Sequence, residues 1–155
     1  MRKLCPSIDD VALLYLGEAL QTFRLGNHLA TAVMLGVAAE QVLLILVDQI
    51  SSSLSTQQKQ EKFTKETKGR HISTQYAHVL PRLKSPASPL PKELEEVLDQ
   101  QLGGIFNLIR RTRNDAGHPT GKQLDRTESH ALLELFPTYC ATVYNLIEWL
   151  KKNKI

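Results

Sequence analysis

The chain has 155 residues, of which 42% are hydrophobic and 23% are charged, and its formal net charge at pH 7 is +3. These values are typical of one globular domain with one hydrophobic core, and they exclude a disordered chain and a multidomain protein. A net charge this small does not by itself indicate a nucleic-acid-binding protein. We expect a single domain over residues 1–155, with its core between residues 7 and 150.

The first predicted helix begins at Ser7, whose hydroxyl can cap a helix, and it carries Asp9 and Asp10 in its first turn. Its apolar stripe has the three-to-four spacing of a helix and consists of Leu13, Leu16, Leu20 and Phe23. Gly26 ends this helix. The next helix, over residues 27–50, is apolar nearly all round, as expected for the central helix of a bundle.

Residues 29–47 form the longest apolar stretch and are long enough to cross a membrane. Glu40 and Gln41 lie near its middle, where an acidic side chain costs roughly 2.5–3.5 kcal/mol on insertion scales. A helix buried in a protein core is therefore the better interpretation. The N-terminal residues also lack the apolar core of a signal peptide. We expect a soluble, cytoplasmic protein without a membrane segment.

Residues 51–70 are rich in serine, glutamine, lysine and glutamate, with Leu54 and Phe63 as their only large apolar side chains. This composition leaves two alternatives open, a mobile connection and a weakly anchored helix that faces solvent. A short helix is expected over residues 72–83. The prolines at positions 81, 86, 89 and 91 then predict a rigid loop.

Another helix is expected from Pro91, which suits a first helical position, to Gly117, which suits a C-terminal cap. The glycine pair at 103–104 interrupts this helix and indicates either a kink or the close approach of another helix. Pro119 disfavours a helical conformation of the preceding residue. His118 should therefore lie just beyond the helix end.

The last predicted helix covers residues 127–152, and Pro137 should kink or split it. The sequence has no strand pattern of useful length. Together these patterns predict an all-α fold, an up-and-down four-helix bundle with one additional short helix.

The cysteines and most histidines place few limits on function. Cys5 and Cys140 have neither a metal-ligand spacing nor the pattern of a disulfide framework, although one bridge between them stays an alternative. His71 and His78 share a helical face and have no acidic or cysteine neighbours. We therefore expect no metal site and no cofactor.

Arg113 is the side chain least expected at its position. At 100° per residue it lies within about 20° of both Leu102 and Phe106, on the apolar face of its helix. Glu40 presents the same problem, because its helical neighbours are apolar residues and glycine. A charge on a core-facing stripe needs a partner or a ligand. We predict that Glu40 faces Arg113 or Arg110, and the alternative role is an ordinary buried salt bridge that fixes helix register.

The same helix end carries a local concentration of positive charge. Between residues 110 and 126 two aspartates stand against five basic residues, namely Arg110, Arg111, Arg113, Lys122 and Arg126. His118 lies among them, and an imidazole can both give and take protons near neutral pH. Arginine offers a permanent charge and a fork of donors that fits phosphate. This combination favours phosphate chemistry, and the alternative for His118 is contact with the last carbonyls of the helix.

This helix end resembles the Arg-x(4–6)-His signature of the HEPN superfamily, in which a polar residue often follows the arginine. The matching string is Asn107-Leu108-Ile109-Arg110-x-x-Arg113-Asn114-x-x-Gly117-His118-Pro119. The setting is similar too, because the motif closes a late helix of an all-helical bundle. It follows an earlier helix of the type Ala30-x-x-x-Met34-x-x-x-Ala38-x-Glu40. The resemblance spans about residues 7–150.

The resemblance implies a metal-independent endoribonuclease that acts as a homodimer, with the two motifs lining one cleft. Arg113 would bind the scissile phosphate and stabilise the charge that develops on it. His118 would act as general base or acid for attack by the 2′-hydroxyl. Asn114 would orient the histidine or the phosphate.

Supporting roles are expected for neighbouring residues. Glu40 would hold Arg113 in position, and Arg110 would add positive charge beside it. Arg111 and Lys122 would attract the RNA backbone independently of sequence. Few aromatic residues lie near the motif, so base stacking is not indicated.

One position departs from the family pattern. In HEPN toxins paired with nucleotidyltransferase antitoxins, a tyrosine that receives the nucleotide often stands two residues after the histidine, where this chain has Thr120. Regulation by that modification is therefore not expected.

The resemblance implies three kinds of partner: RNA, a second copy of the chain, and an antitoxin or regulatory protein. The setting would be a toxin–antitoxin pair, phage defence or RNA processing. One alternative is a non-catalytic HEPN-like bundle that binds a partner protein or a nucleotide. The other is an unrelated helical protein in which the Arg–His pair is a coincidence.

Overall fold

The structure is a computed structural model of the chain and describes residues 1–84, 90–119, 121 and 123–155. Its helices, in chain order, are α1 (Asp10–Arg24), α2 (His28–Ser53), α3 (Gln57–Thr67), α4 (Ile72–Leu83), α5 (Lys92–Val97), α6 (Ile105–Gly117) and α7 (Arg126–Lys152). A π-helical segment, Leu98–Gly104, joins α5 to α6. The described residues contain helices and no strand, which confirms the all-α prediction.

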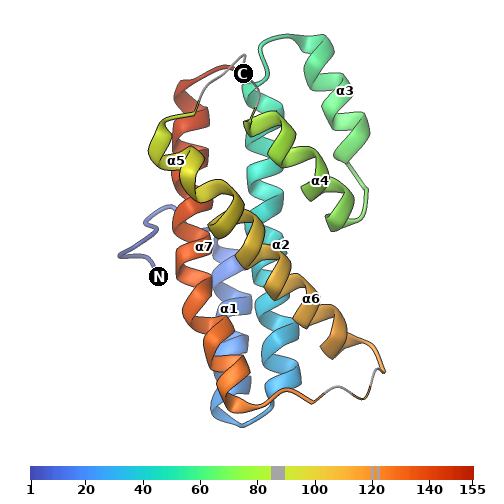
Figure 1. Cartoon of the computed structure of the whole chain (residues 1–155), viewed down its shortest axis with the longest axis vertical. Helices are drawn as coiled ribbons and strands as arrows, with labels where there is room; N and C mark the ends of the chain where they lie inside the picture. The colour runs from blue at the N-terminus through green and yellow to red at the C-terminus, as the bar shows by residue number, and fades with distance from the viewer. Residues whose placement is uncertain (85–89, 120, 122) are drawn as a thin grey trace.

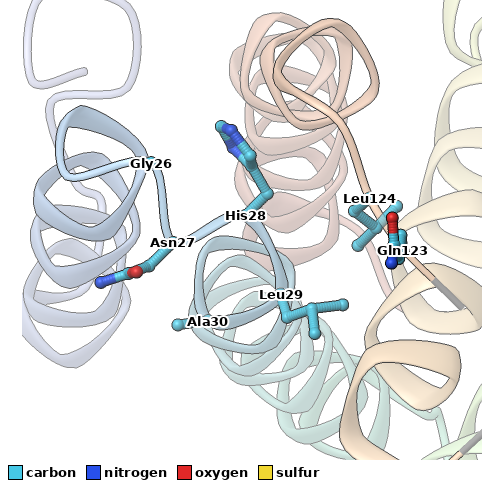
Figure 2. A pocket seen from close by; sticks show the side chains of 7 residues that line it. All are labelled: Gly26, Asn27, His28, Leu29, Ala30, Gln123 and Leu124. Atoms are coloured by element: carbon cyan, nitrogen blue, oxygen red, sulfur yellow. The ribbon is translucent and has the colours of Figure 1, made fainter. Parts of the chain in front are cut away.

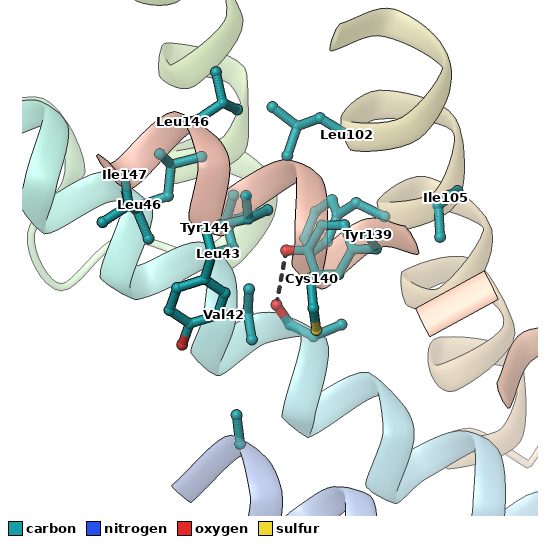
Figure 3. Close-up of a cluster of buried hydrophobic side chains, with 14 of the residues drawn as sticks. Val42, Leu43, Leu46, Leu102, Ile105, Tyr139, Cys140, Tyr144, Leu146 and Ile147 are labelled. Carbon is teal, nitrogen blue, oxygen red and sulfur yellow. Dashed lines mark hydrogen bonds between the residues drawn. The ribbon is translucent and has the colours of Figure 1, made fainter. Parts of the chain in front are cut away.

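The central helix is α2. α1 and α7 run beside it and α6 crosses it, whereas α3 and α4 form a hairpin beside its C-terminal half (Figure 1). By length and composition alone α2 could cross a membrane, yet 56% of its apolar window is buried by the rest of the protein. Its inner side chains, such as Leu43 and Leu46, meet Leu146 of α7 and Leu102 in one core (Figure 3). The remaining helices are therefore arranged around α2.

α1 begins at Asp10, so the predicted cap at Ser7 is wrong. The Asp9 carboxylate accepts hydrogen bonds from the backbone N–H groups of Val11 and Ala12, at 3.0 and 3.1 Å. A carboxylate at this position also meets the positive end of the helix dipole, which a hydroxyl does not exploit.

The polar segment that follows α2 is largely the helix α3. Phe63 is fully buried, Leu54 is 3% exposed and Thr67 is 3% exposed. The helical alternative is therefore the correct one, and α3 is anchored rather than weakly held. Two short helices, not one, separate α2 from α5.

α4 occupies the range predicted for a short helix. Pro81 lies inside its last turn and not in the following loop. Pro86 and Pro89, on which the rigid-loop prediction also depends, lie outside the described residues.

The glycine pair at 103–104 lies in the π-helical segment. A Cβ on Gly103 would lie 2.8 Å from Tyr76 Oη, closer than real Cβ contacts. The space at this glycine is therefore limited by the Tyr76 hydroxyl of α4, and the choice between a kink and close helix approach stays open. The Tyr76 ring also packs against Phe106, with 5.0 Å between the ring centroids. These contacts fix α4 against the start of α6.

The end of α6 differs in detail from the prediction. Gly117 is the last helical residue and not a left-handed cap. The cap is His118, whose φ of −113° and ψ of 151° are the extended values that a following proline favours. At the other end of this long segment, Pro91 is the cap that precedes α5 and not its first residue.

α7 opens with a capping box in which Asp125 and Glu128 satisfy each other's backbone N–H groups. The helix continues through Pro137, so the predicted split does not occur. Phe136 and Tyr139 flank the proline and are both fully buried, so core packing holds this turn in place.

The burial of Phe63 predicts that α3 is an integral part of the fold. Phe63→Ala should lower the free energy of unfolding by about 3–5 kcal/mol, the usual cost of emptying a buried aromatic site. Urea unfolding followed by circular dichroism measures this loss. Gln58→Ala, on the exposed side of the same helix, is the matched control and should change stability little. A Phe63→Ala protein as stable as that control would show that α3 is not anchored through this ring.

Candidate functional site

Arg113 and Glu40 face each other where α6 packs on α2. The distance from Arg113 Nη2 to Glu40 Oε2 is 3.6 Å, and 35% of the arginine side chain and 19% of the glutamate side chain are exposed. The predicted contact is present, and Arg113 rather than Arg110 is the partner within ion-pair distance. Because a third of its side chain is exposed, the guanidinium can also reach a ligand.

Gly36 allows the two helices to approach at this point. A Cβ on Gly36 would lie 2.5 Å from Arg113 Cβ and closer still to Arg113 Cγ. The aliphatic part of the arginine therefore occupies the space that a side chain on α2 would need. Glu40 lies about one helical turn beyond Gly36, so the guanidinium meets it after passing the glycine. In the sequence Gly36 is visible only as a helical neighbour of Glu40.

Burial dominates the electrostatics of Glu40. It raises the pKa of the carboxyl above the usual value, and the charges of Arg113 and Arg110 lower that pKa by less. The second oxygen, Oε1, is buried and has no hydrogen-bond partner within the described residues. A carboxyl whose pKa rises on folding contributes stability below its unfolded pKa, and that contribution is lost as pH rises through the folded pKa. At neutral pH, ionisation of Glu40 therefore does not stabilise the folded protein. A gain in stability does not explain why this ion pair is present.

Asn114 contacts the arginine and not the histidine side chain. Arg113 Nη1 donates a hydrogen bond to Asn114 Oδ1 at 3.0 Å. The guanidinium is thus held by an amide oxygen from its own helix and by the Glu40 carboxylate from α2. Arg110 lies one turn earlier, and its Nε is buried without a hydrogen-bond partner among the described residues. Within the described residues, Arg113 is thus fixed by polar contacts, whereas the Nε of Arg110 is buried without one.

Tyr139 and Tyr76 connect the helices that carry the site to α7 and α4. The Tyr139 hydroxyl donates a hydrogen bond to the carbonyl oxygen of Ala39, the residue before Glu40, at 3.0 Å (Figure 3). The Tyr139 ring stacks on Phe106 at 6.0 Å between centroids, and Tyr76 contacts the same phenylalanine. The backbone of α2 next to Glu40 is thereby tied to α7, and α6 to α4. A buried tyrosine needs such a partner, but the sequence does not say which one.

His118 is exposed at the end of α6. Its backbone N–H donates to the Asn114 carbonyl at 3.1 Å, and within the described residues its imidazole has no hydrogen-bond or ion-pair partner. The alternative in which the ring binds the last carbonyls of the helix is therefore not observed. No hydrogen bond joins it to Arg113, whose side chain is directed toward α2. One protomer thus presents a fixed cation and an unengaged imidazole as separate parts.

Arg111 belongs to a different face of α6. It lies about 160° around the helix from Arg113 and is exposed. With Leu108 it lines a shallow hollow on the solvent side. The structure therefore does not bring Arg111 together with Arg113. Lys122 and Thr120 lie outside the described residues.

A pocket of about 470 Å³ lies at the start of α2 (Figure 2). Its lining residues are Gly26, Asn27, His28, Leu29, Ala30, Gln123 and Leu124. Leu29 shares one face of α2 with Gly36 and Glu40, within about 20°. The pocket therefore lies on the same face of α2 as Glu40, between the start of α2 and residues 123–124. No sequence pattern marks it, because segments far apart in the chain form it.

The other candidate ligands of the sequence are not assembled into a site. Cys5 and Cys140 are free thiols, and burial raises the pKa of both. Within the part of the chain that the structure describes, no three His, Cys, Asp or Glu side chains are placed to hold a metal ion. One expectation is wrong: His78 does have an acidic neighbour, because Glu66 Oε2 lies 3.7 Å from its Nδ1.

Comparison with protein-family models, curated proteins and solved structures gives no match for this chain. The Arg113 site and the motif that contains it are therefore the only features of the described residues that point to a function.

The close packing of Arg113 on Gly36 predicts opposite effects for two glycine-to-alanine changes. Gly36→Ala should destabilise the protein by about 1–3 kcal/mol, because the new methyl group overlaps the arginine side chain. Gly17→Ala, in α1, meets nothing within 4 Å and should stabilise by roughly 0.5–1 kcal/mol through helix propensity. Urea unfolding of both variants checks the pair. A Gly36→Ala protein that gains stability as Gly17→Ala does would contradict the close contact.

Proposed function

We propose that this protein is a metal-independent endoribonuclease of the HEPN type, with Arg113 and His118 as its catalytic residues. In this proposal α1, α2, the segment from α5 to α6, and α7 are the four principal helices of a HEPN-like bundle. The observation that carries the proposal is the placement of Arg113. A partly exposed arginine on an apolar helix face is held by Glu40 at 3.6 Å and Asn114 at 3.0 Å, and the exposed histidine of the motif follows.

Arg113 would act on the phosphate. Its guanidinium is fixed from two sides before any substrate arrives, so little reorganisation is needed when negative charge develops on the phosphate oxygens. Glu40 compensates part of its charge but does not cover it, because 35% of the arginine side chain is exposed. We assign Glu40 and Asn114 as positioning residues on this ground.

His118 would move the proton. In the reaction the 2′-oxygen bonds to phosphorus and the bond from phosphorus to the 5′-oxygen breaks, which leaves a 2′,3′-cyclic phosphate and a 5′-hydroxyl. A base accepts the 2′-hydroxyl proton, and an acid protonates the departing 5′-oxygen. One imidazole cannot take both roles at once. A homodimer that brings two copies of His118 to one cleft would supply both, and we include this dimer in the proposal.

The remaining parts of the proposal concern the setting. RNA is the substrate, the location is cytoplasmic, and the protein serves in a toxin–antitoxin, phage-defence or RNA-processing system with an antitoxin or regulatory partner. Arg110, Arg111 and Lys122 would attract the RNA backbone near the motif.

The test is cleavage of a generic single-stranded RNA in excess chelator. Wild-type protein should release fragments with 2′,3′-cyclic phosphate ends. Arg113→Ala and His118→Ala should each slow cleavage by about 100-fold or more, the usual cost of removing a charge-stabilising donor or a general acid–base group. His130→Ala, which removes another exposed imidazole at the start of α7, is the matched control and should cleave at the wild-type rate.

The possible results separate the alternatives. Cleavage retained in both the Arg113→Ala and His118→Ala proteins would refute the mechanism. If the wild-type protein fails to cleave RNA, the proposal fails and the non-catalytic HEPN-like bundle becomes the better account.

A further inference from the structure

The α3–α4 hairpin carries a larger net positive charge than the whole chain. Residues 57–84 contain seven lysines and arginines and two glutamates, a net charge of +5, whereas the whole chain carries +3. The rest of the molecule is therefore net negative. This concentration lies outside the Arg113 site and was not part of the basic run near His118.

Three lysines form a row on the outer side of α3. Lys62, Lys65 and Lys68 recur every three residues and span about 120° around the helix, opposite the buried Phe63 and Thr67. All three lysines are exposed, and no carboxylate of the described residues lies within ion-pair distance of them.

The acidic residues of the hairpin are engaged elsewhere. Glu66 lies between the two helices, with Oε2 at 3.6 Å from Arg82 and 3.7 Å from His78. Glu61, nearer the start of α3, accepts a hydrogen bond from Gln57 at 2.8 Å. Glu66 is thus paired inside the hairpin, whereas the exposed Glu61 shares the lysine side of α3 and lowers its positive charge by one.

Arg70 extends this row into the turn between the helices. It is exposed and follows Gly69, whose φ of 71° lets the chain reverse direction directly after α3. Lys62, Lys65, Lys68 and Arg70 together are named the hairpin row. The row is held in place relative to α6, because Tyr76 of α4 packs on Phe106.

We propose that the hairpin row binds the sugar–phosphate backbone of the RNA that Arg113 and His118 cleave; RNA as the ligand follows from the proposed function. Unpaired, exposed cations on one helix side are what sequence-independent phosphate binding requires. The row would hold the strand while the site on α6 acts on one phosphate. It also gives a role to the polar segment that follows α2.

A lipid surface is a poorer match for the same charges. A helix that binds a membrane interface needs an apolar face that enters the lipid. The only large apolar side chain of α3, Phe63, is fully buried, and every exposed large apolar residue of the described chain lies outside residues 54–84. The hairpin thus offers charge without an inserting face. It also offers no exposed Phe, Tyr or Trp ring, so binding should depend little on base identity.

The test measures RNA binding rather than cleavage. Binding of a labelled single-stranded RNA to His118→Ala protein is followed by fluorescence anisotropy over a series of salt concentrations. For single strands each phosphate contact contributes about −0.7 to the slope of log K against log salt. The triple variant K62Q/K65Q/K68Q should therefore bind more weakly and show a slope less steep by about 2.

Two further variants serve as controls. R2Q/K3Q/R24Q also removes three positive charges, but from exposed positions in and before α1. This variant should leave the slope of log K against log salt unchanged. K62R/K65R/K68R keeps the charge of the row and should bind as the parent protein does. An unchanged slope in K62Q/K65Q/K68Q, or an equal loss in the α1 control, would overturn the inference.

The remaining outcomes separate this inference from the proposed function. In one outcome, RNA cleavage requires His118 while RNA binding is unaffected by K62Q/K65Q/K68Q. That result would refute the role of the hairpin row and leave the proposed function standing. Binding that depends on the row, without cleavage by wild-type protein, would support the row and refute the proposed function. Row-dependent binding to vesicles of equal parts phosphatidylcholine and phosphatidylserine, without RNA binding, would overturn the inference in favour of a lipid.

Discussion

The contact of Arg113 with Gly36 and Glu40 sets how α6 packs on the central helix. The arginine side chain fits only because position 36 has no Cβ, and its charge is tolerated on an apolar face only because Glu40 meets it. Burial raises the pKa of Glu40 in spite of the arginine, so folding disfavours ionisation of this carboxyl rather than promoting it. We interpret the pair as a means of fixing a guanidinium where a substrate can reach it.

The two basic regions of the protein differ in how their charge is held. Arg113 is tied down by a carboxylate and an amide oxygen, so it has one position and part of its charge is compensated. The hairpin row is exposed and forms no ion pair within the described residues, so it offers long-range attraction without a defined geometry. In the proposed nuclease, Arg113 would act at the reacting phosphate and the hairpin row would attract the rest of the strand.

Much of the fold follows from local patterns. The end of α1 and the extended His118 are dictated by Gly26 and Pro119, whose effects are confined to their neighbours. The pairing of Arg113 with Glu40 was predictable because each charge interrupts an apolar stripe and only an opposite charge on the facing helix resolves both. Local reasoning failed at the cap of α1, where two capping residues competed.

The contacts that could not be predicted from the sequence are those between helices, because they depend on how the helices pack. The space above Gly36, the Ala39 carbonyl that accepts from Tyr139, and the Tyr76 hydroxyl against Gly103 exist only after packing. The charge of the hairpin was present in the composition of residues 57–84. Its significance requires knowing that Glu66 turns inward to Arg82 and leaves the lysines unpaired.

A ¹³C NMR titration of the Glu40 carboxyl, in wild-type protein and in Arg113→Met, tests the central claim most directly. The account predicts a pKa above the usual value in the wild type, because burial outweighs the two arginines. It predicts a further increase in Arg113→Met, because the nearer positive charge is lost. A wild-type pKa at or below the usual value, or one that does not move when Arg113 is replaced, would contradict a buried glutamate held against this arginine.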